Sequence, residues 1–244
     1  MVGDYSTITC AGHEITTEES TAMQNSGSDI KIILDTTSGE SCSTAWASPC
    51  IVDSNNLNQA FMGRIVINTD TLKEQTDAEK IADLMRLTFQ VMGFHSNLYD
   101  YWRDSHGALY EDCLPTKQIT IRDKTVWTLA TPNLLAQAAD EFGCSTIEGM
   151  ELEYNATCNE PGYHWEKRIM YNDIMTTPDA RHLNFVSKIT LAAMSDSGWY
   201  TIVEGSGTNI IWGRNRGCTF LNWKCVSHSG PLSDEFCVDK SNYT

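Results

Sequence analysis

The sequence has no long apolar run and few basic side chains, and each shortage excludes a class of protein. No stretch approaches the roughly 18 apolar residues that a membrane-spanning helix needs. The N-terminal segment, MVGDYSTITC, lacks the apolar core of a signal peptide. Lysine and arginine number 17 against 32 acidic residues, a formal net charge of -15. We therefore expect neither nucleic acid nor an anionic membrane to be the natural partner.

The nine cysteines form no C-x-x-C pair, and their spacing suits no zinc finger. Disulfide bonds formed in an oxidising compartment explain them better, with one thiol left over. Glycosylation sequons begin at Asn155 and Asn242 and point to the same compartment. Together these features predict a glycoprotein that is secreted or held at the cell surface. Its leader would have been removed or would lie outside this chain.

Apolar and β-branched segments predict strands over residues 29–37 and 62–70, and one or two more within 117–132. Three amphipathic helices are predicted as well. The first follows Thr76, which stands at capping-box spacing from Glu79, and ends at a glycine. The others fall at 132–142, with proline in the first turn, and within 184–199.

At 244 residues, the chain is long enough for one moderately large domain or two small lobes. We expect a mixed α+β fold in which residues 1–95 form a lobe with a small twisted mixed sheet and the first long helix. Residues 96–244 would form a second, helical lobe with a cysteine-rich tail held by disulfides.

Six motifs occur along the chain in a fixed order. They are GRIVIN (63–68), VMGF (91–94), TPNLLAQAADEFGC (131–144), HWEKRIMYNDIMT (164–176), SKITLAAMSDSGWY (187–200) and WGRNRGCTFLNWKC (212–225). In this order they resemble the leishmanolysin family of surface metallopeptidases, which belongs to the metzincin clan, and members from ciliated protozoa in particular. The resemblance spans nearly the whole chain. It implies a metzincin-like fold, zinc as the family cofactor, and a membrane-associated surface protein with a part in cell adhesion.

Members of that family carry H-E-x-x-H-x-x-G-F on the active-site helix, where the two histidines bind zinc and the glutamate is the general base. Aligned on the shared glycine and phenylalanine, this sequence has Arg86 and Gln90 at the histidine positions and Leu87 at the glutamate position. His164 matches the third zinc ligand, and Met175 matches the methionine turn beneath the metal. Three of the four catalytic positions are therefore replaced.

None of the replacements supplies the lost chemistry. Arg86 keeps its proton, offers no lone pair and repels a divalent cation. The amide oxygen of Gln90 is a poor zinc ligand beside imidazole. Leu87 cannot activate water, a role worth ~10²–10⁴ in rate. His164 alone cannot hold zinc, because zinc sites use three or four protein donors. We therefore expect no catalytic residue and no bound cofactor.

Two other side chains near the helix could donate to a metal, but neither is well placed. His95 comes after the helix ends, and Asp83 lies one turn before Arg86. The Arg86 guanidinium could itself occupy the former zinc position, bonded to Asp173 or to backbone carbonyls. Alternatively, it points into solvent in a cleft beside Gln90 and His164.

Three functions remain open at this point. The leading one is a catalytically inactive homologue, secreted or surface-attached, that binds a protein or an extended peptide by strand addition in the cleft. The second is a structural subunit of a larger extracellular or organellar assembly, in which the cleft is vestigial. The third is a residual zinc metalloendopeptidase, which is what the family resemblance alone implies.

Overall fold

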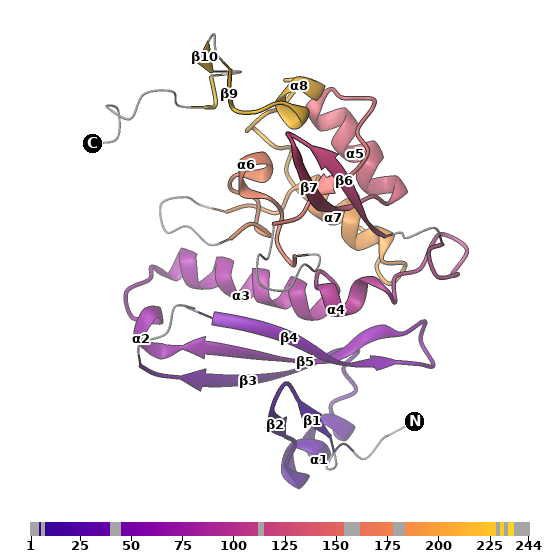
Figure 1. Cartoon of the computed structure of the whole chain (residues 1–244). Coiled ribbons are helices and arrows are strands. Elements are labelled where there is room, and N and C mark those ends of the chain that lie inside the picture. Colours follow the sequence, from indigo (N-terminus) through magenta and orange to yellow (C-terminus); the bar gives the residue numbers. More distant parts are fainter. Residues whose placement is uncertain are drawn as a thin grey trace. The chain divides into compact units, whose positions relative to one another are not determined.

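The computed structural model describes residues 5, 8–39, 45–111, 115–153, 162–177, 184–227, 230–231 and 234–236. Two compact units divide the chain: Met1–Leu109 belongs to the first, and Tyr110–Thr177 with Asn184–Thr244 to the second (Figure 1). Among the described residues, no helix is both long enough and apolar enough to span a bilayer.

The first unit contains a three-stranded mixed sheet with the strand order β3-β5-β4 (Figure 1). β3 (Lys31–Thr37) pairs in parallel with β5 (Gln59–Asn68), and β4 (Ala45–Asp53) pairs antiparallel with β5. The two strands predicted in this region and the mixed character of the sheet are confirmed. β4 was not predicted, because Ser48 and Pro49 interrupt its apolar residues.

α3 (Asp77–Met92) is the first of the predicted helices, and its ends are as expected. Thr76 accepts a hydrogen bond from the backbone N–H of Glu79, whose carboxylate accepts from the backbone N–H of Thr76. This reciprocal capping box satisfies donors that have no partner inside the helix. At the other end, the backbone N–H of Gly93 donates to the carbonyl of Phe89 at 3.0 Å.

The packing of α3 on the sheet depends on a glycine. Leu87 and Val91 of α3 lie in one buried cluster with Ile65 of β5. A Cβ atom at Gly63 would lie 2.4 Å from Cγ1 of Val91. Only glycine therefore lets helix and strand approach this closely, which gives the first residue of the GRIVIN motif a structural role.

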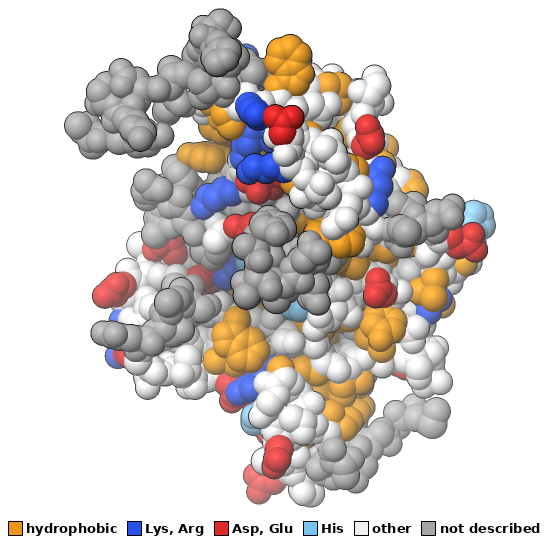
Figure 2. Space-filling model, viewed as in Figure 1, with side chains coloured by type: hydrophobic (Ala, Val, Ile, Leu, Met, Phe, Trp, Pro, Cys, Tyr) orange, Lys and Arg blue, Asp and Glu red, His pale blue; other side chains and the backbone are white. Residues whose placement is uncertain are grey.

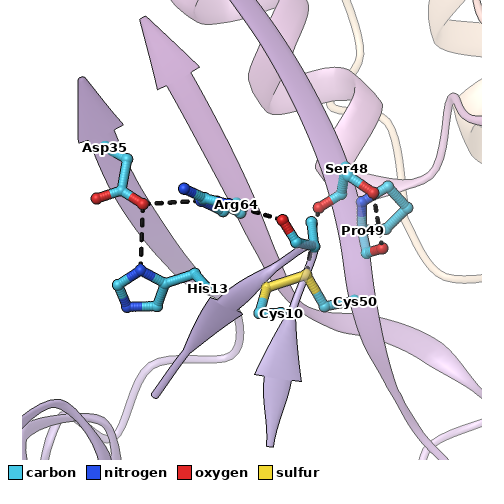
Figure 3. The surroundings of a disulfide bond; sticks show 8 residues. Cys10, His13, Asp35, Ser48, Pro49, Cys50 and Arg64 are labelled. Carbon is cyan, nitrogen blue, oxygen red and sulfur yellow. Dashed lines mark hydrogen bonds and ion pairs between the residues drawn. A yellow bond between two sulfur atoms is a disulfide. The ribbon is translucent and has the colours of Figure 1, made fainter. Parts of the chain in front are cut away.

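Three N-terminal elements pack against the other face of the sheet. They are β1 (Thr9–Cys10), β2 (His13–Glu14) and α1 (Thr17–Asn25). The Cys10–Cys50 disulfide joins β1 to β4 (Figure 3). Beside it, His13 Nδ1 lies 3.2 Å and Arg64 Nε 2.7 Å from the carboxylate of Asp35, as Figure 3 shows. The disulfide, the contact between His13 and Asp35 and the hydrogen bond from Arg64 Nη1 to the carbonyl of Ala11 thus fasten these elements to the sheet.

Two short helices flank α3. α2 (Thr69–Leu72) precedes it, and α4 (Ser96–Tyr99) follows it. Phe94, between α3 and α4, is fully buried and lies edge-on to Tyr99 with ring centroids 6.1 Å apart. Trp102 Nε1 donates to the carbonyl of Gly93 at 3.3 Å. The Gly-Phe pair at the end of α3 is thus held by aromatic packing.

The second unit combines a small antiparallel sheet with helices. The sheet has the order β6 (Thr116–Ile121), β7 (Lys124–Leu129), β8 (Met150–Glu151), and a separate hairpin pairs β9 (Val226–Ser227) with β10 (Gly230–Pro231). The helices are α5 (Pro132–Phe142), α6 (Lys167–Met170), α7 (Lys188–Asp196) and α8 (Cys218–Asn222). α5 packs against α7. The segment predicted as one or two strands forms the β6–β7 hairpin.

α7 is shorter than predicted, and the predicted start of this helix is wrong. Ser187 is its N-cap and accepts a hydrogen bond from the backbone N–H of Thr190 at 3.0 Å. The residues before it are extended, since the carbonyl of Phe185 accepts from the backbone N–H of Ile174 at 2.8 Å. The apolar spacing of 184–187 resembles a helix, but those residues pair with the methionine-turn segment.

The Cys144–Cys218 disulfide joins the end of α5 to the start of α8, across 74 residues of sequence. With Cys10–Cys50, it confirms that cysteines of this chain form disulfides, and it anchors the C-terminal tail of the second unit. Among the described residues, Cys225 has a free thiol. The predicted glycosylation sites at Asn155 and Asn242 lie outside the described residues.

On the face shown in Figure 2, acidic, basic and hydrophobic side chains lie interspersed over both units. The excess of acidic residues gives the chain its net charge of -15.

Candidate functional site

The α3 residues at the family's zinc positions are buried. The Arg86 side chain is 4% exposed, and its Nη2 donates to Oδ1 of Asp83 at 3.2 Å, one turn earlier in α3. The alternative in which the guanidinium points into solvent is therefore wrong. Asp83, considered above as a distant oxygen donor for a metal, is instead an ion-pair partner of this cation.

Leu87 is completely buried and belongs to the hydrophobic cluster between α3 and the sheet. At the position of the family's general base, the chain thus has a core side chain that packs beside Ile65 and Val91. Gln90, at the second histidine position, is also almost fully buried. All three replacements are part of the packed interior of the structure.

His95 has a local structural role at the end of α3. Its Nδ1 accepts a hydrogen bond from the backbone N–H of Asn97 at 3.2 Å, which makes it the N-cap of α4. Because an Nδ1 that accepts carries no proton, Nε2 carries the proton in the neutral ring. This agrees with the interpretation that His95 belongs to the helix exit.

In the second unit, His164 is held by a carboxylate. Its Nδ1 lies 3.3 Å from Oε2 of Glu153, and its ring stands 4.8 Å from that of Tyr163. Glu153 also accepts from the hydroxyl of Thr177 at 2.6 Å. The hydrogen bond from His164 is the main reason that the pKa of Glu153 is lowered. A carboxylate on Nδ1 orients many metal-binding histidines in this way.

Met175 lies in a tight turn built on Asp173. The backbone N–H of Thr176 donates to the carbonyl of Asp173 at 3.1 Å, and that of Met175 to its Oδ1 at 2.7 Å. The carbonyl of Met175 accepts from the backbone N–H of Trp165 at 2.8 Å, which ties the turn to the residue after His164.

The Asp173 carboxylate connects this turn to α7. Its oxygens also accept from the backbone N–H of Ser187 at 3.1 Å and from the Thr190 hydroxyl at 2.8 Å. That hydroxyl accepts from Nε1 of Trp165 at 2.8 Å. Asp173 is fully buried, and burial raises the pKa of its carboxyl despite these hydrogen bonds. Both oxygens of the buried carboxylate thus accept hydrogen bonds from other residues of the chain.

The sequence did not indicate two of these contributors. Glu153 stands 11 residues before His164, and no recognised spacing links a carboxylate to a histidine at that distance. Thr190 looked like an ordinary position of an amphipathic helix. The short loop through the DIMT segment was a signal for Asp173, because an acidic residue often accepts backbone hydrogen bonds two residues on.

The residues at the family's zinc and general-base positions do not fit zinc. The two histidine positions of α3 have a buried, ion-paired cation and a neutral amide, and the general-base position has a core leucine. His164 alone keeps the orientation of a ligand, through Glu153. A zinc site needs three or four protein donors, which these four positions do not supply.

Comparison with known sequences supports the family that the motifs indicate. A sequence profile of the family described as Leishmanolysin matches residues 2–242. A ciliated left-right organizer metallopeptidase from Mus musculus is 32% identical over 204 residues, which are 80% of this chain and 28% of that protein.

Two further relatives are similar over shorter stretches. A leishmanolysin-like peptidase from Drosophila pseudoobscura pseudoobscura is 40% identical over 121 residues, 47% of this chain and 18% of that protein. A leishmanolysin homolog from Crithidia fasciculata is 27% identical over 182 residues, 75% of this chain and 26% of that protein. The chain thus spans less than a third of the length of these relatives.

Proposed function

Because the chain belongs to the leishmanolysin family of metallopeptidases, we propose that it is a catalytically inactive member that binds a peptide or protein without cleaving it. The main observation behind this proposal is that Leu87 is buried. The residue at the position of the general base is part of the hydrophobic core of the first unit.

Catalysis by this family needs a metal-activated water and a base that takes its proton. Arg86 supplies a fixed positive charge and is already paired with Asp83, so it replaces part of the charge of a metal without its ligand chemistry. The folded scaffold is otherwise kept, including Gly63, the capping box of α3 and the turn at Met175. A preserved scaffold with these replacements supports a binding role.

The outer edge of β4 is where we place an extended peptide. β4 is an edge strand of the order β3-β5-β4, and one of its edges already pairs with β5. A peptide can add to the other edge through main-chain hydrogen bonds, while alternate side chains supply specificity. The net charge of -15 favours basic peptides.

The two disulfides fit an oxidising compartment. With the sequons at Asn155 and Asn242, they support secretion or display at the cell surface as a glycoprotein. We therefore place both the chain and its partner outside the cell or in the lumen of a secretory compartment.

Incubation with a library of unstructured peptides tests this function, with mass spectrometry of both the bound and the free fractions. We expect a subset of basic, extended peptides to be retained at intact mass. Methylation of alternate backbone amides along one edge of a retained peptide should weaken binding at least about tenfold, because strand addition uses those N–H groups. Methylation of the opposite edge should be tolerated.

Hydrogen exchange supplies the location of binding. A retained peptide should slow exchange of backbone amides within Ala45–Asp53 and leave Thr116–Ile121, an edge strand of the second unit, unchanged. Retention that is insensitive to methylation of either edge would contradict strand addition. Truncated peptides in the free fraction would contradict inactivity.

A further inference from the structure

The second unit has a hollow of about 340 Å³ beside its small sheet, which is large enough for a small ligand. It is lined by β6 with the turn after it and by residues 146–151. Ile169 of α6, with Leu221 and Asn222 of α8, completes the lining. All of these residues belong to the second unit, so the hollow is a feature of that unit alone.

Arg122 holds parts of this lining together. It forms the two-residue turn between β6 and β7 with Asp123, and both residues have a positive φ, as the tight turns of hairpins require. The turn brings the guanidinium to two acceptors. Nη1 donates to the carbonyl of Leu221 at 2.5 Å, and Nη2 donates to Oε2 of Glu151. Hydrogen bonds of the chain itself therefore fix the hairpin turn, β8 and α8 around the hollow.

Glu151 is a buried carboxylate that can accept a further hydrogen bond. Its side chain is 7% exposed and belongs to the lining. Oε2 accepts from Arg122, whereas Oε1 accepts no hydrogen bond from any part of the chain that the structure describes. Buried polar atoms of proteins nearly always have a hydrogen-bond partner. A ligand with a hydrogen-bond donor would supply the partner that Oε1 lacks.

The charge of the lining favours a cationic ligand. Glu148 is exposed and adds a second carboxylate, against the single guanidinium of Arg122. Close by, burial is the main reason that the pKa of Glu166 is raised, and the charge of Glu151 adds to this more than Arg122 opposes it. A negative potential of this kind attracts cations. Since two carboxylates are too few donors for a zinc or calcium ion, an organic cation fits better.

The buried part of the lining is apolar. Met150, Ile169 and Leu221 are each less than 5% exposed. Ile119 and Ile147 are half-buried and belong to the same lining. Apolar side chains with a few polar groups are typical of small-ligand sites, in which the polar groups fix the orientation. A ligand that fills this hollow therefore combines an aliphatic part with a positively charged end.

We propose that this hollow, the β6–α8 pocket, binds a primary ammonium group on an aliphatic chain, as in a small alkylamine or the side chain of lysine. An ammonium group has three donors and no acceptor, so it matches Oε1 of Glu151 and the carboxylate of Glu148. Its hydrocarbon chain packs against Met150, Ile169 and Leu221. The pocket and the outer edge of β4 are in different units, so this site adds to the proposed function and does not depend on it.

Titration of the whole chain with pentylamine, followed by two-dimensional NMR of backbone amides, tests the pocket. We expect saturable shifts within residues 118–122 and 146–151. Pentanol should bind at least about tenfold more weakly, because it cannot form a charge-assisted hydrogen bond with Glu151. Pentanoate should not bind, because Glu148 and Glu151 repel it.

Nα-acetyl-lysine amide distinguishes two sources of the ammonium group. Tighter binding than that of pentylamine would assign the pocket to a lysine side chain of a peptide, and weaker binding would assign it to a free amine. Either result supports the pocket and identifies its occupant.

Variants of the lining supply the controls. Glu148→Gln should weaken pentylamine binding about threefold. Glu204→Gln, the same change at an exposed glutamate outside the pocket, should leave binding unchanged. Thr120→Trp, at an exposed position of the lining, should block the pocket and abolish saturable binding. Glu151→Gln should weaken binding at least about tenfold, with circular dichroism to show that the variant is folded.

Three outcomes would overturn the proposal. The first is that pentanol binds as tightly as pentylamine. The second is that the NMR shifts fall within Ala45–Asp53 and not in the pocket. The third is that Glu148→Gln and Thr120→Trp both bind pentylamine like the parent chain.

Discussion

Asp173→Ala is expected to lower the free energy of unfolding of the second unit by about 4 kcal/mol. The carboxylate accepts from the backbone N–H groups of Met175 and Ser187 and from the hydroxyl of Thr190. All of these residues are fully buried, so removal of the acceptor leaves donors without water to replace it. Urea unfolding followed by tryptophan fluorescence measures the loss, since Trp165 is bonded to the same network.

Two milder variants show whether the network or mere burial is responsible. Asp173→Asn keeps one acceptor oxygen and should lose about half as much. Thr190→Val removes one donor to Asp173 and the acceptor of Trp165 Nε1, and should cost about 1–2 kcal/mol. If Asp173→Ala cost less than about 1 kcal/mol, the turn at Met175 would not depend on this carboxylate.

The second large loss of stability is expected for Leu87→Glu. This substitution restores the glutamate that other members of the family have at this position. Leu87 is fully buried against Ile65 and Val91. A carboxylate placed there would lose its hydration without gaining a partner, so we expect a loss of about 3–5 kcal/mol in the free energy of unfolding. Restoring the general base alone should therefore damage the first unit and give no peptidase activity.

Leu87→Met is the matched control, because it keeps an apolar side chain of similar volume and should cost less than about 1.5 kcal/mol. Urea unfolding monitored by circular dichroism compares the two variants with the parent chain. A Leu87→Glu variant as stable as Leu87→Met would mean that the side chain at this position leaves the core. The position would then still be open to catalytic chemistry.

The sequence predicted those parts of the fold that depend on neighbouring residues. The capping box at Thr76 and Glu79 acts within one helical turn, and it fixed the start of α3 correctly. Strand structure within 117–132, left open as one or two strands, and α5 were predicted because alternation, proline and glycine all act over a few residues. The family motifs then identified the positions of Arg86, Leu87 and Gln90.

Tertiary contacts account for what the sequence did not predict. β4 is stabilised by its pairing with β5, which its own interrupted pattern does not show. α7 begins at Lys188, later than predicted, because the preceding residues pair with the methionine-turn segment. The direction of Leu87 into the sheet core, and the ion pair between Asp83 and Arg86, follow from packing around α3.

The pairing of Glu153 with His164 has the same origin. The two residues are brought together where Leu152 bridges Trp165, and the backbone N–H of Glu153 donates to the carbonyl of His164 at 2.8 Å. Such a bridge joins segments that are separated in the sequence, so spacing along the chain carries no signal of it. A carboxylate next to this histidine could be found only from the fold.

Zinc content and chelator-sensitive proteolysis, measured on one preparation, decide whether the chain is an inactive member of the family. The chain should be purified with its disulfides intact, incubated with excess zinc, freed of unbound metal and analysed by mass spectrometry for zinc. The same sample should be assayed on an unstructured protein substrate, with a competent family member as the positive control. We predict far less than one zinc per chain and no cleavage above the buffer rate, with or without a zinc chelator. Stoichiometric zinc together with chelator-sensitive cleavage would contradict it.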